Sequence, residues 1–158
     1  MKKKQNASIA DPASAAARQQ NEYGRRILVV DDEDDDRQLL IDVLAFSGYE
    51  VQAVKDGAAG WVALQTHDFD LIVTDNKMPR VTGLEMIEKL RSATMTVPVI
   101  MATRHLPVDE FARRPWLKPD ATLERPFSSE ELLMTVNEVL GTDDGGDDQK
   151  ESLLPKYL

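Results

Sequence analysis

Short apolar runs alternate along this chain with longer segments whose apolar residues recur at helical spacing. Apolar runs rich in β-branched residues are typical of strands buried on both faces of a sheet. Apolar residues three and four positions apart are typical of helices that cover such a sheet. The pattern predicts strands at 27–30, 49–54, 71–74, 97–102 and 121–124, and helices at 34–47, 58–65, 83–92, 107–114 and from Ser128 or Ser129 to 140.

Alternating strands and helices predict an α/β fold, a five-stranded doubly wound parallel sheet with helices on both faces. In the helix at 58–65, Trp61, Val62 and Leu64 are expected to face the core. The helix at 107–114 should be short, because Pro115 follows it and proline ends helices.

Length and charge set the bounds of the domain. The chain has 158 residues, enough for one domain with tails. We expect a disordered extension at 1–24, one domain at 25–141 and an acidic flexible tail at 142–158. A net charge of −9 argues against nucleic acid or an anionic membrane as a partner. No apolar run approaches the roughly 20 residues of a membrane span, so we expect a cytoplasmic protein.

Composition also excludes several kinds of site. The chain has no cysteine, which rules out disulfides, thiol nucleophiles and zinc sites built on thiolates. It has only two histidines, which rules out a metal site of three histidines.

Polar residues follow four of the predicted strands directly. Asp31 and Asp32 follow the first strand, Asp75 the third, Thr103 the fourth and Arg125 the fifth. Taken singly, each has an ordinary interpretation as a helix cap, a turn residue or a surface charge. The carboxyl ends of parallel strands meet at one edge of a sheet, however, so the set is expected to converge on one site.

The chemistry of this set is consistent with phosphoryl transfer. Carboxylates that face one another repel, and Mg²⁺ relieves the repulsion by taking oxygen ligands. A carboxylate beside a bound cation can attack a phosphoryl group and form an aspartyl phosphate. A cation and a hydroxyl from the protein would stabilise the phosphoryl oxygens.

Four segments make the chain similar to the receiver domain of bacterial two-component response regulators. They are ILVVDDEDDDRQLL at 27–40, DLIVTDNKMPRVTG at 70–83, VPVIMATRH at 97–105 and RPF at 125–127. The resemblance covers residues 26–141 and implies the flavodoxin-like strand order 2-1-3-4-5. It also implies a phosphoprotein that signals in a phosphorelay.

The resemblance assigns a role to each acidic residue of the set. Asp75 matches the phosphoacceptor of the family. Asp31 and Asp32 match the acidic pair that organises Mg²⁺ or Mn²⁺, with Asp32 as the direct ligand. The backbone carbonyl of Lys77 matches a further protein ligand to the metal, beside Asp75.

The resemblance also assigns roles to two residues outside the acidic set. Thr103 matches the switch hydroxyl, and Pro126 matches a proline that commonly follows a cis peptide bond.

The chain departs from the family at two positions. Arg125 stands where the family normally has lysine, and a planar guanidinium is not a conservative replacement for an ammonium. Thr122 stands where the family usually has a rotating tyrosine or phenylalanine. The matches therefore predict that Asp75 can be phosphorylated, whereas the two departures argue against the usual signal transmission.

Three residues near the site have competing interpretations. Arg104 either covers the site or pairs with the acidic cluster, or else it is a solvated arginine. His105 is expected at the surface. Trp116 is expected to plug the core, with a partner contact as the alternative.

No output domain is expected after the last helix, so the signal should pass to a partner protein. The resemblance implies a histidine kinase or phosphotransfer protein as phosphodonor, an unidentified downstream protein, and a homodimer as one arrangement open to the family. The chain is expected to accept a phosphoryl group without being a turnover enzyme. One alternative is a pseudo-receiver that works as a phosphorylation-independent interaction module. A remote alternative is a phosphatase of the haloacid dehalogenase type, which needs an aspartate where this chain has Lys77.

Overall fold

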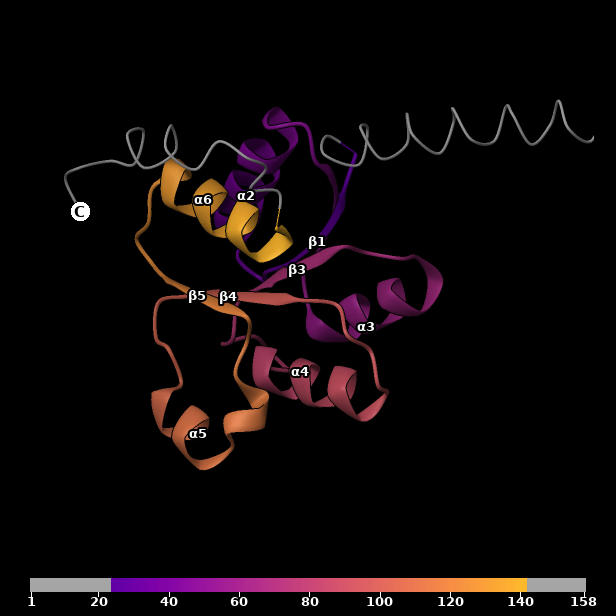
Figure 1. The fold of residues 1–158 in the computed structure, drawn as a ribbon, viewed down its shortest axis with the longest axis vertical. Helices are drawn as coiled ribbons and strands as arrows, with labels where there is room; N and C mark the ends of the chain where they lie inside the picture. The colour runs from indigo at the N-terminus through magenta and orange to yellow at the C-terminus, as the bar shows by residue number, and fades with distance from the viewer. Residues whose placement is uncertain (1–23, 142–158) are drawn as a thin grey trace, which may run out of the picture.

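Five parallel strands form one sheet in the order β2-β1-β3-β4-β5 (Figure 1). The structure is a computed structural model and describes residues 24–141. The predicted extension, up to residue 23, and the predicted tail at 142–158 lie outside the described residues. The strands are β1 (Arg26–Val30), β2 (Glu50–Val54), β3 (Leu71–Thr74), β4 (Val99–Thr103) and β5 (Ala121–Glu124). The predicted fold class and strand order are confirmed.

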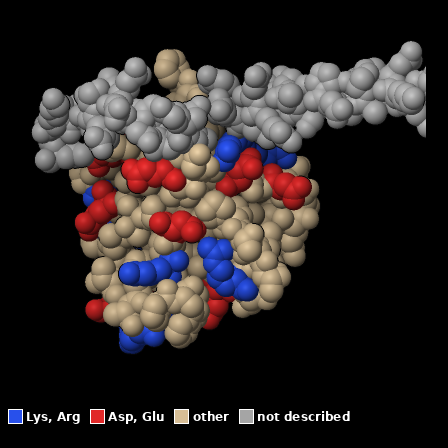
Figure 2. Space-filling view, viewed as in Figure 1, with Lys and Arg blue, Asp and Glu red and all other residues tan. Residues whose placement is uncertain are grey.

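Helices cover both faces of the sheet. The helices are α2 (Asp34–Phe46), α3 (Gly57–Thr66), α4 (Gly83–Ser92), α5 (Val108–Arg113) and α6 (Ser129–Leu140), with a 3₁₀ turn η1 (Pro115–Leu117). Figure 1 shows α2 and α6 on one face, and α3, α4 and α5 on the other. Within residues 24–141, no helix is both long enough and apolar enough to cross a membrane. Figure 2 shows acidic and basic side chains mixed on the face of the domain seen in this view.

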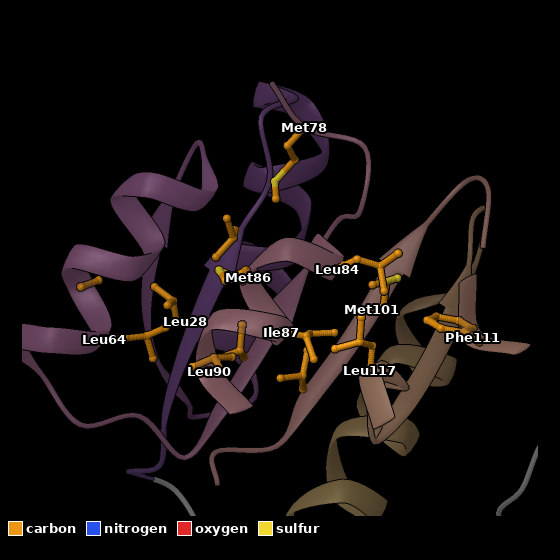
Figure 3. Close-up of a cluster of buried hydrophobic side chains, with 14 residues drawn as sticks. Leu28, Leu64, Met78, Leu84, Met86, Ile87, Leu90, Met101, Phe111 and Leu117 are labelled. Carbon is orange, nitrogen blue, oxygen red and sulfur yellow. The ribbon is translucent and has the colours of Figure 1, made fainter. Parts of the chain in front are cut away.

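The inner strands are buried on both faces, as their continuous apolar sequences predict. In β1, Leu28 and Val30 pack on the side of α3 and α4, whereas Ile27 and Val29 pack on the side of α2 and α6. The first side also holds Met78, Leu84, Met86, Ile87, Leu90, Met101, Phe111 and Leu117 (Figure 3). Two apolar layers therefore fix the sheet and hold the ends of its strands in place.

Side-chain caps begin three of the helices. Thr82 and Glu85 form a reciprocal capping box at the start of α4. The Ser128 hydroxyl accepts a hydrogen bond from the backbone N–H of Glu131, so α6 is capped by the first of the two candidate serines. Asp56 caps α3 in the same way through the N–H of Ala59.

Several predicted boundaries and orientations are wrong. The fourth strand runs from residue 99 to 103 and not from 97 to 102, so Thr103 is its last residue. Val62 is 58% exposed, because α3 turns Ala63 and Leu64 to the sheet and leaves Val62 on its outer side. Trp116 is 66% exposed and does not plug the core. Successive residues of a 3₁₀ turn point about 120° apart, and in η1 it is Leu117 that is buried.

Candidate functional site

Five of the predicted site residues, Asp32, Asp75, Lys77, Thr103 and Arg125, line one pocket at the carboxyl ends of the strands. The fully buried Asp31 lies beside this pocket, close to Asp32 and Asp75. The pocket measures about 530 Å³, and it is lined by Asp32, Glu33, Asp36, Asp75, Lys77, Met78, Pro79, Thr103, Arg104, His105 and Arg125. Met78 forms part of its floor and joins the pocket to the apolar layer beneath, where Figure 3 shows it at one end of the cluster. The rule that strand ends share an edge is thus confirmed for this sheet.

The sheet hydrogen bonding continues just past the strands and anchors three site residues. The N–H of Asp31 donates to the carbonyl of Val54 at 3.1 Å, and the N–H of Asp75 donates to the carbonyl of Val30 at 3.0 Å. The N–H of Arg125 donates to the carbonyl of Thr103 at 2.9 Å. The backbone of each residue is therefore held by the sheet, and only its side chain is free to do chemistry.

Three carboxylates lie together in the site. Asp31, Asp32 and Asp75 each offer one oxygen, and these oxygens lie within 4.8 Å of one another. Asp31 is fully buried, whereas Asp32 and Asp75 are half-buried. A close set of carboxylate oxygens is the donor type that hard divalent cations take in proteins. The residues present therefore fit Mg²⁺ in kind and in spacing.

Both oxygens of the Asp31 carboxylate are already engaged. Oδ1 accepts the backbone N–H of Glu33 at 3.0 Å, and Oδ2 accepts Nη2 of Arg125 at 2.8 Å. Burial raises the pKa of Asp31 to about 6, against the lowering effects of the Glu33 N–H and the Arg125 guanidinium. The negative charge of Asp75 raises it further. The carboxylate of Asp31 thus depends on nearby positive charge to remain ionised.

Asp75 lies at the point where β3 meets the loop that leads to α4. Its Oδ1 accepts the backbone N–H of Asn76 at 2.7 Å. The backbone of Gly83 passes so close that a Cβ there would lie 2.5 Å from the Asp75 carbonyl oxygen. Asn76 bridges the two ends of the loop, because its carbonyl accepts the N–H of Gly83 and its side chain accepts the N–H of Leu84. The glycine and the asparagine together fix the backbone that carries Asp75.

Arg125 is a buried cation in this site. Its side chain is 6% exposed, and Nη1 lies 3.6 Å from Oδ1 of Asp36 in addition to the bond with Asp31. The guanidinium carbon lies 5.3 Å from the ring centroid of Phe127. Its Nε is buried and has no hydrogen-bond partner among residues 24–141. The bond between Arg125 and Pro126 is cis, as the resemblance implies.

Arg104 pairs with the acidic residues at the mouth of the pocket. Its Nη2 lies 3.1 Å from Oδ2 of Asp36, which confirms the interpretation that it pairs with the acidic cluster. His105 is exposed, as expected, and its N–H lies 3.5 Å from the Thr103 hydroxyl. Thr103 is 2% exposed, so its hydroxyl is available only from inside the pocket.

Sequence reasoning missed Asp36. It stands in the acidic run at the start of α2, where Asp34, Asp35 and Asp36 suit the helix dipole, and nothing local distinguishes the third from the others. The sequence does contain one feature that points to a second acidic partner, which is Arg125. A longer, forked cation in place of lysine needs a second acceptor. Thr122 is exposed on β5 and has no aromatic ring to rotate.

Comparison with known proteins identifies the family. The family model for the response regulator receiver domain matches residues 27–137. The chain belongs to this family. It is 35% identical over 104 residues to response regulator MprA of Mycobacterium sp. (strain KMS), a match over 66% of this chain and 45% of that protein. It is 30% identical over 102 residues to the transcriptional regulatory protein RprY of Bacteroides fragilis, over 65% of this chain and 43% of that protein.

Solved structures agree with this assignment. A chemotaxis response regulator of Vibrio cholerae has a TM-score of 0.68 and 30% identity, covering 73% of this chain and 98% of that chain. Response regulator TrrA of Thermotoga maritima, solved in complex with Mg²⁺-BeF, has a TM-score of 0.64 and 28% identity over the same shares. This receiver domain spans less than half the length of the curated relatives it matches.

Proposed function

We propose that this receiver domain accepts a phosphoryl group on Asp75 from a phosphohistidine of a histidine kinase or phosphotransfer protein. The observation that carries the proposal is the convergence of Asp75, Thr103 and Arg125 with two further aspartates in one pocket. Family membership supports it, and so does the Thermotoga maritima relative that was solved with Mg²⁺-BeF.

The transfer places one new bond on Asp75. A carboxylate oxygen of Asp75 attacks the phosphorus and forms a P–O bond, while the P–N bond of the donor breaks and its electron pair stays on the imidazole nitrogen. Oδ1 of Asp75 accepts the Asn76 N–H, which orients the carboxylate. The attacking group is an ionised carboxylate, so Asp75 itself needs no general base.

Asp31, Asp32, Asp75 and the backbone carbonyl of Lys77 would hold Mg²⁺ or Mn²⁺, with Asp32 as a direct ligand. When bound, the cation neutralises the charge that builds up on the transferring phosphoryl oxygens. Both carboxylate oxygens of Asp31 already accept hydrogen bonds, from Glu33 and Arg125, so a cation that takes Asp31 as a ligand shares this carboxylate with Arg125.

Thr103 and Arg125 would receive the new phosphoryl oxygens. The buried Thr103 hydroxyl can donate one hydrogen bond, and Arg125, which also lines the pocket, supplies a positive charge. Its Nε has no hydrogen-bond partner among residues 24–141. Because Thr122 offers no ring to rotate, we propose that the signal leaves through contact of the surface around Thr103 and Arg104 with a downstream protein partner.

Intact-mass spectrometry after incubation with acetyl phosphate tests this function. We expect a Mg²⁺-dependent gain of roughly 80 Da, the mass of one phosphoryl group, on a single aspartate. Asp75→Asn should abolish the gain, whereas Asp109→Asn, an exposed carboxylate outside the pocket, should retain it. A protein that binds Mg²⁺ but gains no mass, from acetyl phosphate or from a phosphorylated histidine donor, would contradict the proposal and indicate an interaction module.

A further inference from the structure

Each of the two carboxylate oxygens of Asp36 pairs with a different arginine. Oδ1 lies 3.6 Å from Nη1 of Arg125, and Oδ2 accepts Nη2 of Arg104 at 3.1 Å. Asp36 projects from the first turn of α2, Arg125 follows β5, and Arg104 follows β4. One carboxylate therefore ties three elements together across the mouth of the pocket.

The fork of Arg125 reaches two carboxylates at once. Nη2 binds the fully buried Asp31, and Nη1 faces Asp36, which lines the pocket nearer the surface. A lysine ammonium carries its three donors on one nitrogen, so it reaches two acceptors only where both lie close to that single atom, whereas Arg125 uses two separate nitrogens. Arginine at position 125 and aspartate at position 36 are thus matched to each other.

Arg125 and a divalent cation would compete for the negative charge of the Asp31 carboxylate. Oδ2 of Asp31 is bound to Arg125, and Asp31 belongs to the three carboxylates that fit the cation. A cation that draws on Asp31 therefore weakens its bond with Arg125. A buried guanidinium without a negatively charged partner would be strongly unfavourable. Phe127 beneath it offers only the face of its ring.

We propose that Asp36 is a positioning residue that keeps Arg125 paired when Asp31 turns to the divalent cation, and that it thereby sets the metal affinity of the site. This inference rests on the proposed function, because it concerns the same metal site. Asp36 is not one of the three carboxylates whose oxygens lie close enough together to share a cation. It acts through the guanidinium of Arg125, and its pair with Arg104 restrains its own carboxylate.

Calorimetric titration with Mg²⁺ tests the proposal without any phosphorylation. The matched control for Asp36→Asn is Asp35→Asn, which removes the same charge from the same turn of α2. Asp35 is exposed and makes no ion pair with any residue of 24–141. We expect Asp36→Asn to weaken Mg²⁺ binding about fivefold more than Asp35→Asn, as coupled neighbouring charges do.

The same pair of substitutions in an Arg125→Gln background completes the test. Without the guanidinium, Asp36→Asn and Asp35→Asn should weaken Mg²⁺ binding equally. If Arg125→Gln does not fold by circular dichroism, Arg125→Lys replaces it, and the excess effect of Asp36→Asn should fall below about twofold. Equal effects in the wild-type background, or an excess that persists without Arg125, would overturn the inference and leave the proposed function standing. A wild-type protein that binds no Mg²⁺ would overturn both.

Discussion

Arg125 donates from Nη2 to Oδ2 of Asp31 at 2.8 Å, and both side chains are buried. This pair joins the end of β5 to the end of β1 across the pocket. Breaking a buried ion pair on one side is costly, because it leaves the other charge without compensation. The pair between Arg125 and Asp31 therefore contributes to the stability of the fold as well as to the chemistry of the site.

Replacing Arg125 by glutamine should destabilise the metal-free protein by about 3–5 kcal/mol at pH 7.5, since Asp31 is then a buried carboxylate without its cation. Urea unfolding in EDTA measures the free energy of unfolding. The loss should shrink at pH 5, where Asp31, whose pKa is raised to about 6 in the intact protein, binds a proton. Arg125→Gln combined with Asp31→Asn should recover most of the stability. An equal loss at both pH values would show that the charge of Asp31 is not the cause.

Asp31 should also make the metal-free protein less stable as pH rises from about 4 to about 6. Burial raises its pKa in the folded state from 3.8 to about 6, so the folded state holds a proton that the unfolded state has already lost. The free energy of unfolding therefore falls through this window, by at most about 1.4 kcal/mol per pH unit, and levels off about one pH unit above the folded-state pKa.

Other carboxylates work in the opposite direction, so the comparison is made with Asp31→Asn. Hydrogen bonds with Thr82 and Arg114 lower the pKa values of Glu85 and Glu110, which therefore lose their contribution as pH falls. Subtracting the wild-type unfolding curve from that of Asp31→Asn cancels them. The difference in unfolding free energy should move in favour of Asp31→Asn between pH 4 and pH 6. A difference that does not change with pH would contradict the raised pKa.

The fold and the centre of the site could be predicted because both follow from local patterns. Apolar β-branched runs mark the strands, and parallel strands bring Asp31, Asp75, Thr103 and Arg125 to one edge whatever the details of packing. The role of Asp36 could not be predicted in this way. It depends on the length of the Arg125 side chain and on the distance between α2 and β5, which no run of neighbouring residues encodes.

Gly83→Ala should displace the loop that carries Asp75. A Cβ at Gly83 would lie 2.5 Å from the Asp75 carbonyl oxygen and 3.0 Å from the Cα of Asn76, and backbone atoms cannot turn away. We expect a loss of about 1–3 kcal/mol of stability together with weaker Mg²⁺ binding. Thermal unfolding and calorimetry measure the two effects.

Gly60→Ala is the matched control for this substitution. Its Cβ would meet the side chains of Val30 at 3.2 Å and Met86 at 3.3 Å, away from the pocket. These contacts require the neighbouring side chains to shift by only a few tenths of an ångström, and alanine favours a helix by about 1 kcal/mol over glycine. Mg²⁺ binding should remain unchanged in this variant. Equal effects of the two substitutions on Mg²⁺ binding would show that Gly83 has no special relation to Asp75.

Neighbouring residues of η1 should respond very differently to truncation. Trp116 is 66% exposed and Leu117 is 1% exposed, although the sequence alone favoured the larger side chain as the buried one. Trp116→Ala should therefore change the free energy of unfolding by no more than about 0.5 kcal/mol, as surface substitutions do. Leu117→Ala should cost about 2–5 kcal/mol, because it leaves a cavity in the layer beneath α4 and α5. Urea unfolding of the two variants decides between these values. A large loss from Trp116→Ala would place the indole against the core after all, and would restore the plug that the sequence suggested.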